Sequence, residues 1–432
     1  MKSLAFATEG FGVEKGSTAE EAGGEKSVIQ ACTSATWLKQ ALKLCVLVAC
    51  MTAVIFQLSE CILKLSYPPL STRTELKINS TLSYPALTIC RNPPYKANVL
   101  KDYGLASEIT HTSEWAKFPF NETTLAEFWQ KATYSESENF VIYGLGSSPS
   151  HVEMKSTFYF ENGLCHSLIP IISTKEVGSS SGWSIVLKHA VTTKPDPRTP
   201  WKVFVHQVND AFTENTLQNF GSQELIILPI GEQLNVKLTV QQLERKDHPK
   251  SECNPDWQYS ATNCVERCRW QEIADKAGCS VPWMPGVGYP ECNNYTAMRT
   301  VMVEYRKNTV SEQCSEQCGK PCHITQYSAF LVNRETIATS SAPRYYSQMY
   351  VFHTSKMITS VKEHADYDLS RFVADAGGSL GFLLGVSVLS LLSMLGKVLQ
   401  IFTCCAKKST DGGSVSTSRS SSINSAVNII KR

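Results

Sequence analysis

The sequence predicts an α+β membrane protein, with two transmembrane helices flanking a large, disulfide-rich extracellular domain. Two observations support this class. An apolar stretch lies near each end of the 432 residues, and ten of the sixteen cysteines lie between the two stretches. The expected divisions are a mobile cytosolic arm at 1–40, a first span at 41–65, an extracellular domain at 66–370, a second span at 371–403 and a cytosolic Ser-rich tail at 404–432.

The first apolar stretch runs from Ala41 to Leu65. Lys43 lies at its start, and Glu60 and Lys64 lie near its outer end. About 20 predominantly apolar residues suffice to cross the core of a bilayer. The preceding residues are acidic and contain no hydrophobic run, unlike the basic flank and apolar core of a cleavable signal peptide. We therefore expect the first span to serve as the targeting signal as well.

The second apolar stretch runs from about Ala376 to Phe402, and Lys397 is its only charged residue. Lysines lie before or at the start of the first stretch, at Lys26, Lys39 and Lys43, and after the second stretch, at Lys407 and Lys408. Because basic residues favour the cytosolic side of a membrane, both termini are expected in the cytosol. The protein is then a multi-pass protein of the plasma membrane.

The central segment has the features of an oxidising, extracellular compartment. Its cysteines are even in number, and the sequons at Asn79, Asn121 and Asn294 predict glycosylation on the same side of the membrane. Zinc binding is the alternative for the cysteines, but structural zinc sites favour CxxC pairs, whereas three residues separate Cys264 from Cys268. We expect disulfides and no metal.

Composition and motifs argue against two other classes of protein. The formal net charge is +2, without a basic face or arginine block, so no nucleic acid partner is expected. The chain contains neither an HExxH motif nor a paired catalytic signature. An ectoenzyme is therefore disfavoured, and no cofactor is expected.

Hydrophobic periodicity in the central segment predicts mainly strands. Alternating or β-branched runs begin at Trp183, Trp201 and Leu234, each bounded by turn residues. Helical spacing is weaker but present at Cys264–Ala277 and Tyr295–Arg306. Small helices joined by disulfides beside a sheet fit this pattern.

Two faces can be distinguished on the second span if it is one ideal helix at about 100° per residue. One narrow arc is polar and contains Asp375, Ser379, Ser390, Ser393 and Lys397. Nearly opposite lies a smooth face of Gly377, Gly381 and Gly385. Small residues permit close contact between membrane helices, and polar residues at membrane depth usually face water or a bundle interior. Several copies of this helix around a water path are therefore expected.

Beyond these patterns, the stretch Tyr84-Pro-Ala-Leu-Thr-Ile-Cys90 is similar to the FPAVTIC signature of the degenerin, epithelial sodium channel and acid-sensing ion channel superfamily. Further landmarks resemble that superfamily in the same order: Gly163-Leu-Cys165, Trp201-Lys-Val-Phe-Val-His206, Pro229-x-Gly231, Cys264-x3-Cys268, Trp283-Met-Pro, Cys314-x3-Cys318-x2-Pro-Cys322, and Asp375-x-Gly377-Gly378 leading into Gly385-Val386-Ser387. The resemblance covers residues 33 to 400 and is specific in combination.

The resemblance implies a trimeric channel with a β-sheet palm, a helical thumb and a pore along the second spans. It implies a subunit of a sodium-permeable, amiloride-sensitive cation channel, in a homo- or heterotrimer with related subunits within membrane lipid, gated through the extracellular domain by a ligand, protons or mechanical load. It also implies five disulfides: Cys90–Cys165, Cys253–Cys322, Cys264–Cys318, Cys268–Cys314 and Cys279–Cys292. Spacing alone does not choose among the possible pairings.

Residue roles in the pore follow from the same resemblance. Three copies of Asp375 would form an anionic ring that attracts cations, although an ordinary carboxylate at the start of a helix is the simpler reading of the residue alone. Gly385-Val386-Ser387 stands at the selectivity position, where the resemblance implies an unwound belt whose carbonyls replace the hydration of an ion. Simple helix packing is the alternative. Ala374, Gly377 and Gly378 stand at the gate.

Departures from the superfamily leave a second function open. The His-Gly pair expected before the first span is absent at Thr33-Ser34-Ala35, Ser393 replaces an acidic residue, and Lys397 lies deeper in the span. Lysines at an inner mouth repel cations unless they snorkel aside. The alternative is a non-conducting accessory or receptor-like subunit that modulates a heteromeric channel. An ATP-gated trimeric channel would need clustered lysines for phosphate, which the sequence lacks.

Overall fold

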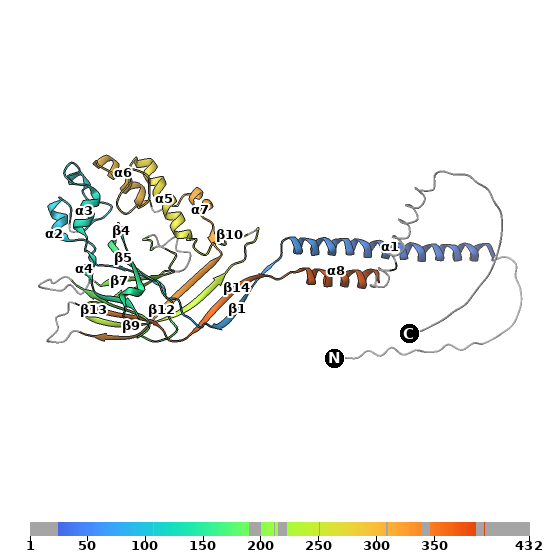
Figure 1. The fold of residues 1–432 in the computed structure, drawn as a ribbon. Coiled ribbons are helices and arrows are strands. Elements are labelled where there is room, and N and C mark those ends of the chain that lie inside the picture. Colours follow the sequence, from blue (N-terminus) through green and yellow to red (C-terminus); the bar gives the residue numbers. More distant parts are fainter. Residues whose placement is uncertain are drawn as a thin grey trace, which may run out of the picture. The chain divides into compact units, whose positions relative to one another are not determined.

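The computed structural model describes residues 25–106, 108–189, 200–210, 212–214, 223–249, 251–307, 310–337, 346–385 and 393. The chain divides into two compact units (Figure 1). The first unit, Met1–Pro68 with Tyr367–Arg432, contains the helices α1 (Glu25–Ser66) and α8 (Leu369–Leu384). The second unit, Pro69–Asp366, contains all the described strands and the remaining helices. Its bounds agree closely with the predicted extracellular domain.

The larger sheet of the second unit has seven strands: β1 (Leu70–Ile78), β3 (Phe140–Leu145), β6 (Trp183–Lys188), β9 (Glu232–Glu244), β12 (His323–Thr336), β13 (Tyr346–His353) and β14 (Met357–Ala365). The order is β1-β14-β9-β13-β6-β3, and β12 also pairs with β9. β1 and β14 are antiparallel, with Leu70 opposite Ala365 and Ile78 opposite Met357. They are the strands that lead along the chain from α1 and into α8.

The second sheet has five strands: β2 (Ala86–Cys90), β4 (Val152–Tyr159), β5 (Gly163–Pro170), β7 (Trp201–His206) and β8 (Glu224–Leu228), in the order β4-β5-β2-β7-β8. The short strands β10 (Cys253–Asn254) and β11 (Lys320–Pro321) form a separate parallel two-stranded sheet. At the first residue of β5 the backbone lies close to Pro94. Gly163 has φ of 66°, and a Cβ there would lie 2.8 Å from the carbonyl oxygen of Pro94. This position therefore requires glycine.

Side chains from both sheets form one hydrophobic core, and its pattern confirms the predicted strands. β6, β7 and β9 lie where the period-two runs at Trp183, Trp201 and Leu234 predicted them. In β9 the buried positions alternate at Leu234, Val236, Leu238 and Val240. Successive side chains of a strand point to opposite faces, so one face of β9 joins the core.

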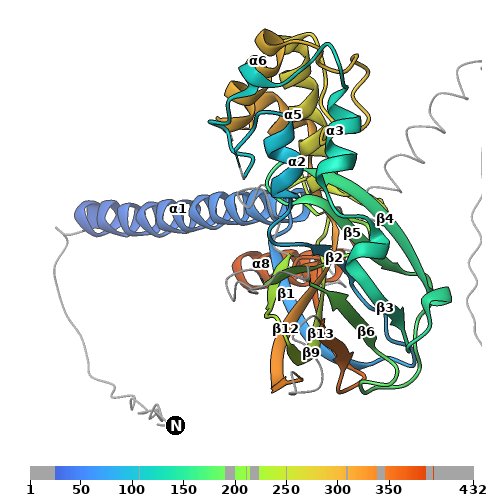
Figure 2. The ribbon, with the colours of Figure 1, turned by 90° about the vertical axis from the view of Figure 1, so that its left-hand side faces the viewer.

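The described helices of the second unit are α2 (Ala97–Asp102), α3 (Leu125–Ala132), α4 (Glu136–Asn139), α5 (Ala261–Ala277), α6 (Tyr295–Arg306) and α7 (Glu312–Gln317), with 3-10 turns at Trp115–Lys117 and Pro149–His151. Figure 2 shows α2, α3, α5 and α6 gathered on one side of the strands. Both predicted helices are confirmed as α5 and α6. Ser260 caps α5 by accepting from the Asn263 N–H at 3.1 Å, and Gly278 ends it with φ of 70°.

A second hydrophobic core, rich in aromatic rings, joins these helices. The rings of Trp115 and Trp129 stack with centroids 5.7 Å apart, and Trp129 also meets Trp283 at 4.8 Å. Aromatic pairs add to the free energy gained by burying their surface. The segment between Cys90 and Cys165 supplies much of this core through α3 and the turn at Trp115. The remainder of this core comes from α5, α6 and the loop between them.

Helix α1 is longer than the predicted first span. It begins at Glu25, so residues 25–40 of the predicted cytosolic arm are helical. Its portion Gln40–Ser66 is long and apolar enough to cross a membrane, and only 6% of its most apolar window is buried within the chain. An apolar surface facing outward needs lipid or further protein around it.

Helix α8 ends where the family resemblance implies an unwound belt, so the ideal helix assumed for the whole second span does not hold. It ends at Leu384, and Gly385 follows in the left-handed conformation with φ of 64° and ψ of 21°. Its 16 residues are fewer than a bilayer requires. Ser390 and Lys397 lie outside the described residues. A helical wheel extended from Asp375 beyond Gly385 is therefore invalid, because the helix does not continue through that glycine.

Candidate functional site

The start of α8 is fixed by Asp368. This residue is the N-cap, and its carboxylate accepts from the Arg371 N–H at 2.8 Å. An aspartate at this position satisfies a backbone donor that lacks a helical partner and meets the positive end of the helix dipole. Asp375 lies two turns further along. The alternative role for Asp375 as a helix cap is therefore filled by Asp368.

Asp375 is exposed and is held by a tyrosine that comes just before the helix. The Tyr367 hydroxyl donates to a carboxylate oxygen of Asp375 at 3.0 Å, and Tyr367 itself is buried. One turn later the Ser379 hydroxyl donates to the main-chain carbonyl of Asp375 at 2.8 Å. A hydrogen bond to an ionised acceptor is stronger than a neutral one. This arrangement fixes the orientation of the carboxylate at the top of α8.

The surface of α8 beside Asp375 is smooth and open. Ala374, Gly377 and Gly378 are exposed, and a Cβ added at either glycine would meet nothing within 4 Å. Phe382, one turn below this region, is 89% exposed. Small residues allow another helix to approach closely, and an apolar side chain left exposed needs such a neighbour or lipid. Both features suit a helix that meets further helices.

The end of α8 offers polar backbone groups. The Gly385 N–H bonds back to the Leu380 carbonyl, and the last carbonyls of any helix lack partners within it. The predicted selectivity residues Val386 and Ser387 lie outside the described residues. The structure thus brings Ala374, Asp375, Gly377 and Gly378 together on one helix and places Gly385 at its end.

Helices α1 and α8 lie side by side and antiparallel (Figure 1). Near the end of α8 they enclose an apolar groove of about 370 Å³, lined by side chains such as Leu47, Cys50 and Leu383, with Lys43 at its edge. Polar groups at the other end, around Asp375, contrast with this groove.

The second unit is held by five disulfides, which are the pairs that the family resemblance implies: Cys90–Cys165, Cys253–Cys322, Cys264–Cys318, Cys268–Cys314 and Cys279–Cys292. Two of them join α5 to the region of α7, and Cys279–Cys292 closes the loop between α5 and α6. Crosslinks of this kind restrict the unfolded chain and stiffen a region with little core of its own.

The three glycosylation sequons and one cysteine-containing cluster lie on this unit. Asn121 and Asn294 are exposed and Asn79 is partly buried, so their glycosylation remains a prediction. Among the described residues, Cys268, Glu272 and Cys314 form a group with the spacing of metal ligands. Both of its sulfurs are joined in a disulfide and have no thiolate to offer a metal.

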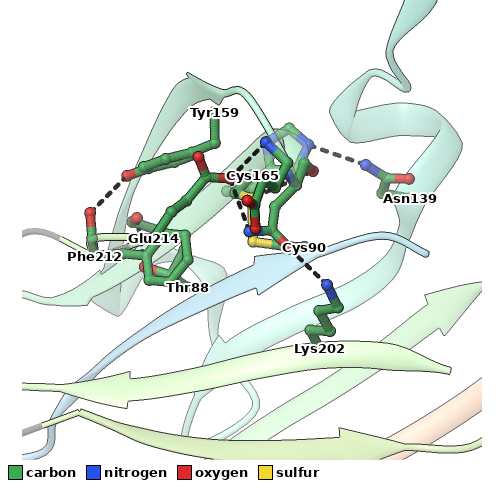
Figure 3. The surroundings of a disulfide bond; sticks show 12 residues. Thr88, Cys90, Asn139, Tyr159, Cys165, Lys202, Phe212 and Glu214 are labelled. Atoms are coloured by element: carbon green, nitrogen blue, oxygen red, sulfur yellow. Dashed lines mark hydrogen bonds between the residues drawn. A yellow bond between two sulfur atoms is a disulfide. The ribbon is translucent and has the colours of Figure 1, made fainter. Parts of the chain in front are cut away.

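A polar network surrounds the Cys90–Cys165 disulfide (Figure 3). The Glu214 carboxylate accepts from the backbone N–H groups of Phe160, Glu161 and Asn162 at 2.8–3.1 Å. It also accepts from the Asn162 side chain at 2.8 Å and from the Tyr305 hydroxyl at 3.1 Å. One carboxylate thus ties the turn between β4 and β5 to α6.

A second carboxyl group lies nearby on α5. Glu266 is buried and accepts from the Thr213 hydroxyl. Burial raises the pKa of Glu266 to about 7, against the opposing effect of the Thr213 hydrogen bond. Burial likewise raises the pKa of Glu214 to about 7, and the charge of Glu161 adds to this while the Asn162 donors oppose it.

Buried histidines in the five-stranded sheet show the opposite tendency. His206 lies within 2.8 Å of the Thr88 hydroxyl, and His166 lies within 3.0 Å of the Asn139 amide and 2.8 Å of the Ser156 hydroxyl. Burial lowers the pKa of both imidazoles. Both are hydrogen-bonded side chains within the sheet.

Sequence reasoning missed two of these features: the partner of Asp375 and the two buried carboxyl groups. The end of α8 at Gly385 lies where the family resemblance implies an unwound belt. One signal was present for Glu266, which shares a helical face with Arg269 and Ile273, both of them buried. No local pattern distinguishes Glu214. Its role depends on contacts with residues more than 50 positions away.

Comparison with known proteins agrees with this arrangement. The family described as "Amiloride-sensitive sodium channel" matches residues 26–395. The human bile acid-sensitive ion channel is 21% identical over 424 residues, which cover 83% of this chain and 80% of that protein. Acid-sensing ion channel 1A of Danio rerio is 23% identical over 160 residues, covering 33% of this chain and 31% of that protein.

Among solved structures, a cryo-EM structure of a proton-activated chloride channel gives a TM-score of 0.32 with 8% identity, covering 84% of this chain and 98% of that one. A likeness at this level supports no statement about fold or function. The family match, in contrast, includes α1, the whole second unit and α8. The relatives named above are ion channels rather than enzymes. The chain belongs to the amiloride-sensitive sodium channel family.

Proposed function

We propose that this chain is a pore-forming subunit of a sodium-permeable, amiloride-sensitive cation channel in the plasma membrane, with both termini in the cytosol. Three subunits, identical or related, surround the pore. The observation that carries this proposal is the exposed Asp375 at the start of an apolar helix whose small residues leave room for neighbours. The family match across both ends of the chain supports it.

In this proposal the Asp375 carboxylates form an anionic ring at the outer mouth and concentrate cations there. Ala374, Gly377 and Gly378 form the gate, because their small side chains let the three helices close upon one another. Gly385, Val386 and Ser387 form the selectivity region. The helix end at Gly385 supports this, since carbonyls without helical partners are able to replace water around an ion.

The stimulus acts on the second unit, which β1 and β14 connect along the chain to α1 and α8. The names of the relatives associate them with bile acid or with acid. A chemical cue, either a ligand or protons, is therefore preferred over mechanical load. Disulfides around α5 and α7 make that region stiff enough to transmit a movement rather than absorb it.

The alternative is a non-conducting accessory subunit. The absent His-Gly pair at 33–35, Ser393 and Lys397 favour it. Expression of the chain alone and together with a related subunit separates the two functions. A pore-forming subunit gives cation current alone that amiloride blocks. An accessory subunit gives none alone, and changes the current of its partner.

A further inference from the structure

A buried contact joins helix α1 to the start of α8. Among the described residues of the first unit, three side chains are buried: Val54 and Cys61 of α1, and Tyr367 directly before the N-cap of α8. Val54 and Cys61 are seven positions apart, so they lie on one face of α1. This face packs against the segment that contains α8, and Cys61 meets Tyr367 there.

The contact between Cys61 and Tyr367 is polar. The Cys61 thiol and the Tyr367 hydroxyl are hydrogen-bonded to each other. A tyrosine hydroxyl has a single proton, and Tyr367 donates it to the Asp375 carboxylate at 3.0 Å. Its oxygen therefore accepts, and the thiol donates. The result is a chain of two hydrogen bonds that begins on α1 and ends at the carboxylate of α8.

Burial gives this thiol a fixed partner. Among the free cysteines of the described residues, Cys45 is exposed and Cys50 is partly buried, whereas Cys61 is only 7% exposed. A buried donor does not exchange its acceptor for water. Hydrogen bonds in a chain also polarise one another, so a donor to the Tyr367 oxygen makes its O–H group a better donor to Asp375. The thiol thus strengthens the bond that holds the carboxylate.

We infer that Cys61 is a positioning residue for the Asp375 carboxylate and that it acts through Tyr367. The inference rests on the proposed function, in which Asp375 faces the permeating cations. It gives α1 a part in setting the charge at the mouth, although no residue of α1 is placed in the pore. A packing role for Cys61 would depend on the volume of its side chain and not on the S–H donor.

The first test measures block of the amiloride-sensitive current by external Ca²⁺. Cys61→Val removes the donor and keeps an apolar side chain of similar size, so Asp375 becomes more available to cations. Half-block is expected at a Ca²⁺ concentration lower by about twofold or more, since a thiol is a weak donor. Cys61→Ser keeps a donor and should block as the native chain does. A packing role predicts the reverse order of these two variants.

Two further variants show whether Cys61 acts through Tyr367. In the Tyr367→Phe background, Cys61→Val should have no additional effect on Ca²⁺ block, because the group that connects it to Asp375 is already gone. Cys50→Val is the matched control. Cys50 is a free cysteine of the same helix and lines the apolar groove near the end of α8. Its replacement should leave the block unchanged.

The hydrogen bond itself is measured without any current. The S–H stretching band of Cys61 is isolated by infrared difference spectroscopy of the full chain in lipid nanodiscs, by subtracting the spectrum of Cys61→Val. In Tyr367→Phe, with the double variant subtracted, the band should shift to higher frequency because the thiol has lost its acceptor.

Failure of the inference and failure of the proposed function are distinguishable. Absence of current from the native chain and every variant contradicts the proposed function, and the infrared band then decides the inference by itself. An S–H band that does not shift in Tyr367→Phe, native Ca²⁺ block in Cys61→Val, or additive effects of Cys61→Val and Tyr367→Phe would each overturn the inference.

Discussion

The hydroxyl of Tyr367 donates to the carboxylate of Asp375 at 3.0 Å, across the first two turns of α8. Tyr367 follows directly after the second unit, which ends at Asp366. Asp375 is the residue proposed to face the cations. This hydrogen bond therefore links the orientation of the proposed mouth carboxylate to the residue at which the chain enters the membrane unit.

Replacing Tyr367 with phenylalanine should increase block of the current by external Ca²⁺. The variant keeps the buried ring but removes the donor, so Asp375 loses a charged hydrogen bond of about 1.5–3 kcal/mol and becomes available to cations. We expect half-block at a several-fold lower Ca²⁺ concentration. Tyr346→Phe, at an exposed tyrosine of β13, is the control and should leave the block unchanged. An unaltered Ca²⁺ dependence in Tyr367→Phe would show that the bond does not control the carboxylate.

The disulfides Cys264–Cys318 and Cys268–Cys314 should be non-additive in stability. They are nested inside Cys253–Cys322, so removing either one enlarges a small ring, whereas removing both also releases the 46-residue inner loop. From the loop-closure relation we expect losses of about 2 kcal/mol for each single removal and about 5 kcal/mol for both. Denaturant unfolding of the purified chain with paired Cys→Ser variants measures this.

The Cys279–Cys292 pair supplies the comparison. Its 13-residue loop lies within the loop closed by Cys268–Cys314, and the pair shares no short ring with Cys264–Cys318. Its removal should be additive with removal of Cys268–Cys314 to within about 0.5 kcal/mol. Strictly additive losses of stability for Cys264–Cys318 and Cys268–Cys314 would contradict the loop-closure estimate.

Glu266→Gln should stabilise the second unit at alkaline pH and reduce its dependence on pH. The folded protein keeps this carboxyl protonated up to about pH 7, whereas the unfolded chain ionises it near 4.5. The folded state then binds more protons between these values, so its stability falls as the pH rises through this window. The amide cannot ionise, and the gain at pH 8 should be at most about 3 kcal/mol.

Thermal or denaturant unfolding of the full chain from pH 4 to pH 8 checks this prediction. Glu272→Gln on the same helix is the control, because Glu272 is only partly buried. The pH dependence that His206 gives to stability has the opposite sign. Burial lowers its pKa, so its contribution to stability is lost as the pH falls below 6.5. A Glu266→Gln curve parallel to that of the native protein would show that the carboxyl is ionised in the fold throughout.

The sequence was sufficient wherever a signal is local or periodic. Alternation predicted β6, β7 and β9, and helical spacing predicted α5 and α6, because burial on one face imposes these periods directly. The cysteine pairs required the family resemblance, since ten cysteines in one segment leave many pairings open.

Features that depend on distant contacts or on a single backbone angle were not predictable. The residues next to Glu214 in sequence do not mark it as buried. Its hydrogen bonds come from residues 160–162 and from Tyr305, which are distant in sequence. The end of α8 depends on one left-handed glycine. Gly385 in an apolar run is equally compatible with a continuous membrane helix, so only the family resemblance indicated an unwound segment there.

The central claim is that α8 lines a cation pathway entered at Asp375. The most direct test is whole-cell recording from Ala374→Phe, whose bulk beside Asp375 should hold the helices apart and open the pore without its stimulus. Delivery to the cell surface is confirmed by biotinylation. The account predicts an inward sodium current that amiloride blocks and that Asp375→Asn, but not the capping variant Asp368→Asn, reduces several-fold. Surface-expressed Ala374→Phe without current, or with current indifferent to Asp375→Asn, would contradict it.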